Sequence, residues 1–176
     1  MSSVLASWND ADEAAAFEAI IACCGARRWA ATMVSLRPIT SIVELSAAAD
    51  RVWGTMEEAD WMEAFASHPR IGARAVPHPS ARSAAWSRQE QSSAAANTAR
   101  VLLELAAGNA LYEQQFGFTY IVCATGKSAE EMLSILVQRL ARDRSAEVLE
   151  AAEQQRQIMQ IRLGKWCHEQ DYDACA

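Results

Sequence analysis

Among the three histidines of the chain, His68 has the surroundings that best suit chemistry. It stands directly before Pro69, and because proline disfavours helical dihedral angles in the preceding residue, we expect His68 where a helix ends. It also lies at the mouth of segment 69–84, which holds three of the four prolines and is the clearest predicted loop. Imidazole can donate or accept a proton near neutral pH. A lone histidine is more often structural, so this position alone predicts no reaction.

Three further residues could serve a polar site near His68. Ser87-Arg-Gln-Glu90 is a capping pattern at the start of a helix, so Glu90 is either a cap or a carboxylate that orients an imidazole. The amide of Gln91 could hydrogen-bond an amide-like substrate from both its ends. Arg162 follows Ile158 by one turn on an apolar helix face, where it either forms a buried salt bridge or binds a planar carboxylate or ureido group. The pattern leaves these alternatives open.

Other common site chemistries have little support in the sequence. The chain has no HExxH or CxxC motif, so we expect no metal site. It also has neither a glycine-rich phosphate loop nor a GxSxG motif. Cys123 is a weak candidate nucleophile because it lies in an apolar run with no neighbour that would lower its pKa.

The elements that must position these residues are predicted to be helices. Apolar side chains at helical spacing indicate a first helix over residues 11–24 with Asp10 as its N-cap. A long helix after Ser87 is expected to end at Gly108, and Asn109 to cap a short helix ending near Phe116. Residues 118–124 are predicted to form a short buried extended piece. The remaining helices are expected around Trp29–Leu36, after Ser41, over 57–66, after Ser128, and over 145–166.

Composition and pattern together predict an all-α protein, a single compact domain over residues 1–176 with about seven or eight helices and a polar tail at 167–176. Hydrophobic residues make up 51% and charged residues 22% of the chain, as in ordinary globular proteins. The net charge is −6 without a basic stripe, so nucleic acid is not an expected partner.

The chain is expected to lie in the cytoplasm and away from membranes. It has no signal-peptide pattern, and no apolar run approaches the roughly 20 residues that span a bilayer. The five cysteines are odd in number and lack CxxC spacing, which favours reduced thiols and a cytoplasmic location.

Five motifs in a fixed order give the chain a family resemblance over roughly residues 11–165. Together they resemble the 2-oxo-4-hydroxy-4-carboxy-5-ureidoimidazoline (OHCU) decarboxylase family, although each motif alone is weak. The motifs are Ser67-His-Pro-Arg-Ile-Gly72, Trp86-Ser-Arg-Gln-Glu-Gln91, Tyr112-Glu-Gln-Gln-Phe-Gly-Phe118, Tyr120-Ile-Val-Cys-Ala-Thr-Gly126 and Ile161-Arg-Leu163.

The resemblance implies an all-helical, usually dimeric enzyme that needs no metal or organic cofactor. It implies that His68 is the catalytic histidine and that Glu90 lies beside it. The positions matching the family's substrate-binding residues are Pro69, Ser87, Gln91, Tyr120, Ile121, Val122, Cys123, Ala124 and Arg162. Two positions depart from the commonest pattern, since many members have Phe at the position of Tyr120 and an acidic residue at that of Arg70.

The expected reaction is therefore cofactor-independent decarboxylation of a small ureidoimidazoline to (S)-allantoin, the last step from urate to allantoin, carried out by a homodimer. Two alternatives belong to other classes. One is a helical interaction module that has kept the fold without the activity, and the other is a lyase or hydrolase acting on another cyclic ureide.

Overall fold

The computed structural model describes residues 3–70 and 99–173, and within these ranges the chain forms eight α-helices and no strand. The all-α class expected from the sequence is confirmed. None of the described helices is long and apolar enough to cross a lipid bilayer. Ser87, Glu90 and Gln91 lie outside the described residues. The helices are α1 (Ser3–Asp10), α2 (Glu13–Cys24), α3 (Arg27–Ser35), α4 (Ile42–Trp53), α5 (Glu58–Ala66), α7 (Ala99–Phe116), α8 (Ala129–Arg139) and α9 (Arg144–Asp173).

The described residues belong to two compact units. A terminal unit contains residues 3–64 and 156–173, and a central unit contains residues 65–70 and 99–155. Helices α5 and α9 each contribute residues to both units. The single domain expected over 1–176 stays a prediction.

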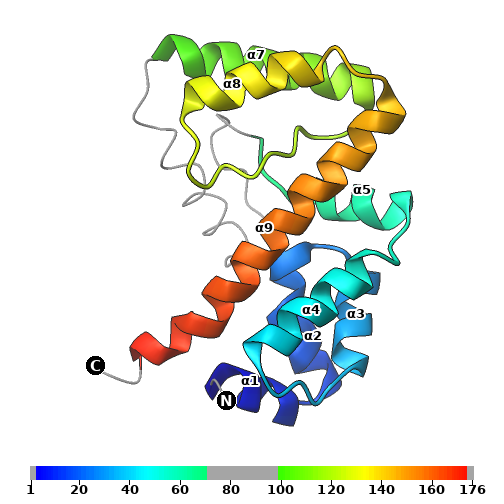
Figure 1. Ribbon diagram of the computed structural model, residues 1–176, viewed down its shortest axis with the longest axis vertical. Helices are drawn as coiled ribbons and strands as arrows, with labels where there is room; N and C mark the ends of the chain where they lie inside the picture. The colour runs from blue at the N-terminus through cyan, green and yellow to red at the C-terminus, as the bar shows by residue number, and fades with distance from the viewer. Residues whose placement is uncertain (1–2, 71–98, 174–176) are drawn as a thin grey trace. The chain divides into compact units, whose positions relative to one another are not determined.

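In the terminal unit, helices α1 to α4 pack in sequence order, α1 on α2, α2 on α3 and α3 on α4 (Figure 1). Asp12, not the expected Asp10, is the N-cap of α2, because its side chain accepts a hydrogen bond from Ala15 N at 2.8 Å. Asp10 instead ends α1, a helix that the sequence reading missed. Ser41 caps α4 as expected, accepting from Glu44 N at 3.1 Å.

The second half of α9 completes the terminal unit and makes polar contacts with α4. Arg156 Nη1 donates to both carboxylate oxygens of Asp50 in α4 at 3.0 Å. Gln160 accepts from the hydroxyl of Ser46 at 2.7 Å and donates to its carbonyl oxygen at 3.0 Å. These pairs fix α9 against α4 along this part of the unit.

In the central unit, α7 and α8 lie side by side (Figure 1). The expected helix end at Gly108 is wrong, since α7 continues through Gly108 and Asn109 to Phe116. A Cβ atom at residue 108 would lie 2.6 Å from Leu136 Cδ2, so this glycine allows close packing of α8. Ser128 and Glu131 form the expected capping box of α8. Met132 and Leu136 are buried as expected, whereas Val137 is 60% exposed.

Candidate active site

His68 lies just beyond the C-terminus of α5, as the following proline predicted. Its backbone N–H donates to the carbonyl oxygen of Phe65 at 3.1 Å, which closes a final turn before Pro69 ends the helical path. The residue is partly exposed, although its Nε2 atom is buried. An imidazole in this setting can contact a bound molecule while its position is fixed by a helix end.

The segment around His68 is anchored on both sides to residues that precede the buried segment 120–124. On one side, the rings of Phe65 and Phe118 have centroids 5.2 Å apart. On the other side, Arg70 Nε donates to Glu113 of α7 at 2.7 Å, and Glu113 also accepts from the Thr119 hydroxyl at 3.5 Å. The structure therefore brings the His-Pro segment to the start of the second predicted substrate-binding stretch.

Residues 120–124 form an irregular segment that is almost fully buried in the central unit. Their exposed fractions lie between 1% and 6%. Within the predicted piece 118–124 the burial is confirmed except at Thr119, which is partly exposed, and the piece is not a strand. The chain enters the segment through Gly117, whose φ of 82° is a conformation that glycine adopts without strain. An aromatic cluster of Tyr112, Phe116, Phe118 and Tyr120 packs around this turn.

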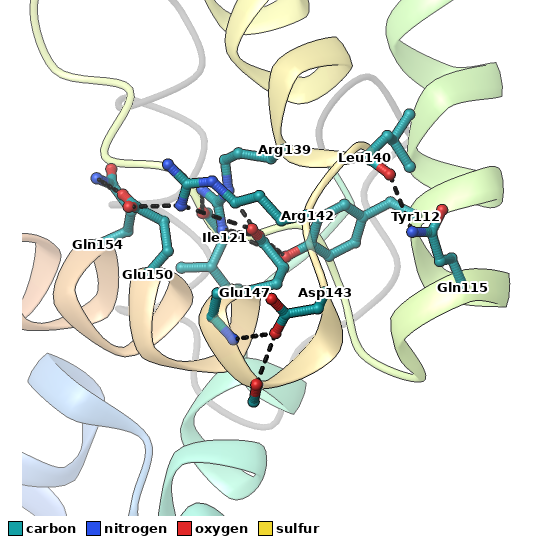
Figure 2. Close-up of polar contacts among 12 residues, drawn as sticks. Tyr112, Gln115, Ile121, Arg139, Leu140, Arg142, Asp143, Glu147, Glu150 and Gln154 are labelled. Carbon is teal, nitrogen blue, oxygen red and sulfur yellow. Dashed lines mark hydrogen bonds and ion pairs between the residues drawn. The ribbon is translucent and has the colours of Figure 1, made fainter.

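A buried arginine of α8 binds the 120–124 segment through the backbone of Ile121 (Figure 2). Arg139 Nη1 donates to the carbonyl oxygen of Ile121 at 2.6 Å, and its Nε donates to Glu147 of α9 at 2.6 Å. Its Nη2 donates to the hydroxyl of Tyr112 at 3.2 Å, and that hydroxyl in turn donates to Glu147. The side chains of Arg139 and Glu147 are 3% and 0% exposed, so each charge is compensated inside the unit.

Further hydrogen bonds fix neighbouring groups of the same segment. Cys123 N donates to Gln154 Oε1 at 2.9 Å, and Lys127 Nζ donates to the carbonyl oxygen of Cys123 at 2.8 Å. The hydroxyl of Tyr120 donates to the Met132 carbonyl of α8 at 3.1 Å. Burial raises the pKa of Tyr120 well above its ordinary value, so this phenol stays protonated. Tyr120 therefore turns its polar end into α8.

Arg162 lies in the terminal unit, on the part of α9 that also carries Ile158. Both residues are buried, which confirms that they share an inward helix face. Arg162 is 0% exposed, so its charge lies entirely within the protein.

The predicted site residues thus divide between the two units. His68, Pro69 and the stretch Tyr120 to Ala124 belong to the central unit, and Arg162 belongs to the terminal unit. Arg139 and Glu147 were not among the site residues predicted from the sequence. Arg139 follows Met132 and Leu136 at helical spacing, so a charged residue on an apolar face was the signal that could have identified it. Among the described residues, no group of three or more His, Cys, Asp or Glu side chains could hold a metal ion.

Over the described residues, fold and site define a helical protein with a histidine at a helix end, whose flanking residues contact the chain that leads into a buried backbone segment. The model of the OHCU decarboxylase family matches residues 9–164, and the chain belongs to this family. The resemblance inferred from five motifs is confirmed.

Two curated relatives agree with this membership. The chain is 38% identical over 144 residues to the uric acid degradation bifunctional protein TTL of Arabidopsis thaliana, a match covering 81% of this chain and 44% of that protein. It is also 38% identical over 55 residues to the 2-oxo-4-hydroxy-4-carboxy-5-ureidoimidazoline decarboxylase of Amia calva, covering 31% of each. The matched region covers less than half the length of each of these relatives.

Solved structures give the same fold. A crystal structure of OHCU decarboxylase in the presence of (S)-allantoin matches with a TM-score of 0.73 and 34% identity, over 84% of this chain and 96% of that one. A crystal structure of (S)-allantoin synthase, 17% identical, matches with a TM-score of 0.67 over 92% of this chain and 53% of that one. The second likeness concerns the fold alone.

Proposed function

We propose that this chain decarboxylates 2-oxo-4-hydroxy-4-carboxy-5-ureidoimidazoline to (S)-allantoin, the last step from urate to allantoin. The observation that carries the proposal is the match to 96% of an OHCU decarboxylase chain crystallised in the presence of (S)-allantoin, at 34% identity. The placement of His68 at a helix end, between two residues that contact the chain leading into segment 120–124, supports a site in this region.

The substrate supplies its own electron sink in this reaction. When the bond between the hydroxyl-bearing ring carbon and its carboxylate breaks, carbon dioxide leaves and the electron pair passes into the adjacent C=N group of the ring, whose carbon bears the ureido group. The protein must then stabilise the developing charge and deliver one proton to the new carbon centre. This is why we propose that no organic cofactor or metal takes part.

We assign the proton transfer to His68. As an imidazolium it would donate a proton to one face of the neighbouring ring carbon, which bears the ureido group, and so form the C–H bond of a single allantoin enantiomer. The hydroxyl proton moves to the ring nitrogen, and the carbon that lost the carboxylate becomes a ring carbonyl. Glu90, the carboxylate in the second motif, would orient this imidazole and raise its pKa by placing a negative charge beside it. The proton lost by His68 returns from solvent after the product leaves.

The remaining site residues would bind the ureido and ring groups. Pro69, Ser87 and Gln91 would contact the substrate near His68, and backbone groups of Tyr120, Ile121, Val122, Cys123 and Ala124 would hold its amide edges. Arg162 would bind its polar oxygens through the planar guanidinium fork. We further propose a homodimer that acts in the cytoplasm on a small-molecule substrate.

The test is a coupled assay that generates the unstable substrate in place. Urate, urate oxidase and the hydrolase that acts on the product of that oxidation are mixed, and circular dichroism follows allantoin formation with and without this chain. We expect faster formation of one allantoin enantiomer. No acceleration over the spontaneous decay would overturn the proposal, and acceleration of hydrolysis of another ureide instead would assign a different reaction.

A further inference from the structure

Beyond the residues that would touch substrate, the central unit contains a buried arginine whose bonds all go to the protein. Arg139 uses all three nitrogens of its guanidinium, Nη1 on the Ile121 carbonyl, Nε on Glu147 and Nη2 on the Tyr112 hydroxyl (Figure 2). With its side chain 3% exposed, this group has each of its nitrogens bonded inside the unit. It is therefore placed to act on other groups of the chain.

The geometry requires a guanidinium in particular. Its Cζ atom lies 5.0 Å from the ring centroid of Tyr120 and 5.8 Å from that of Tyr112, while its nitrogens donate to three different groups. A lysine ammonium is a compact charge on a flexible stem and cannot reproduce a planar fork that stacks and donates at once. Glu147 of α9 accepts a hydrogen bond from Arg139 Nε and so fixes the position of the guanidinium.

The group that Arg139 holds lies in the middle of the predicted substrate-binding stretch. The Ile121 carbonyl bonds to Arg139, and the amide and carbonyl of Cys123 bond to Gln154 and Lys127. Side chains thus fix both residues that flank Val122. The segment does not form a β-strand within the part of the chain that the structure describes, so its backbone is not held by hydrogen bonds to a neighbouring strand. These side-chain hydrogen bonds hold its backbone instead.

We infer that Arg139, held by Glu147, is a positioning residue that sets the backbone of residues 121–123 for ligand binding. This inference rests on the proposed function, in which backbone groups of this stretch hold the substrate. Arg139 acts through the Ile121 carbonyl and does not itself touch the ligand. Its loss displaces the binding groups while leaving the proton donor in place, so it weakens substrate binding more than it slows turnover.

The first experiment compares Arg139→Lys with wild type in the coupled circular dichroism assay. We expect KM to rise about 10-fold with kcat within about threefold, and the inhibition constant of (S)-allantoin to rise in parallel. The matched control is Arg37→Lys in the terminal unit. Arg37 also donates to backbone carbonyls, those of Trp8 and Ala11, and stacks on the Trp8 ring. The control should lower Tm and leave KM within about twofold of wild type.

A second variant keeps the test valid if the lysine variant does not fold. In Arg139→Met with Glu147→Gln, both buried charges are removed together, so no ion is left uncompensated, and the new amide can still accept from Tyr112. We again expect a raised KM. If the wild type is active and the folded Arg139 variants keep KM within about twofold of it, the positioning role is overturned and the proposed function stands. A wild type without activity rejects the proposed function and the positioning role with it.

Discussion

Gly108 and Leu136 approach so closely that a Cβ atom added to residue 108 would lie 2.6 Å from Leu136 Cδ2. Leu136 is fully buried, so its side chain has little room to move away. We expect Gly108→Ala to lower the free energy of unfolding by about 1 kcal/mol, because overpacking exceeds the gain in helix propensity. Urea denaturation measures the change.

A glycine in an open helical position provides the control for this substitution. At Gly164 of α9, no described atom lies within 4 Å of an added Cβ apart from its chain neighbours and its own helix backbone. Gly164→Ala should therefore raise the free energy of unfolding by about 0.5–1 kcal/mol. Equal changes of the same sign at both glycines would show that the contact with Leu136 does not limit residue 108.

The hydroxyl of Tyr120 should matter for stability and not for turnover. It donates to the Met132 carbonyl of α8, so Tyr120→Phe is expected to cost about 0.5–1.5 kcal/mol of unfolding free energy. KM in the coupled assay should stay within about twofold of wild type. A large rise in KM with unchanged stability would place the hydroxyl at the ligand.

His68 is expected to be essential for turnover and of little weight for folding. It is partly exposed and lies beyond the last turn of α5, so His68→Asn should shift the unfolding free energy by less than about 0.5 kcal/mol. The loss of the proton donor should reduce kcat by about 10²–10⁴-fold. A folded variant with wild-type kcat would remove His68 from the reaction.

The bond between Arg70 and Glu113 should affect catalysis more than stability. Arg70 is 63% exposed, so a double-mutant cycle of Arg70→Ala and Glu113→Ala should give a stability coupling below about 1 kcal/mol. Because the pair anchors the segment that carries His68, each single variant should reduce kcat/KM by roughly threefold to tenfold. The charge-swapped pair Arg70→Glu with Glu113→Arg should recover part of this loss. No recovery, with additive losses, would argue that the two side chains act separately.

Acid should remove the contribution of Glu150 to stability. The hydrogen bond donated by Arg142 lowers the pKa of Glu150, so the folded state favours the ionised carboxylate. A lowered folded pKa gives stability that is fully present at neutral pH and is lost as pH falls through that pKa. The deficit in unfolding free energy of Glu150→Gln relative to wild type should therefore be larger at pH 7 than at pH ~3. Urea denaturation at both pH values checks this, and an equal deficit at both would contradict it.

Local sequence rules predicted most helices because each rests on nearby residues. Pro69 placed His68 at a helix end, and Ser41 and Ser128 marked two helix starts through their caps. The periodicity of α9 placed Arg162 on a buried face. These features depend on spacings of a few residues, which the sequence displays directly.

Features that depend on distant partners could not be predicted in this way. Helix α1 is short, and its Trp8 packs edge-on against Trp166 near the other end of the chain. Gly108 was predicted to end a helix because glycine is common at helix ends. Its place inside α7 is explained by its contact with Leu136, which the sequence does not show. Arg139 could be recognised as a charge on an apolar face, but its partners Ile121, Glu147 and Tyr112 come from three different segments.

The make-up of the terminal unit has a consequence for how the chain folds as it is synthesised. Ser46 and Asp50 find their partners Gln160 and Arg156 only 114 and 106 residues later. Helices α1 to α4 therefore leave the ribosome long before the segment of α9 that completes their unit, while every residue of the central unit is made in between. At typical synthesis rates of about 5–20 residues per second, those four helices wait for several seconds with an apolar face uncovered. Folding of the terminal unit therefore depends most on keeping this apolar face from aggregating while the chain is still being synthesised.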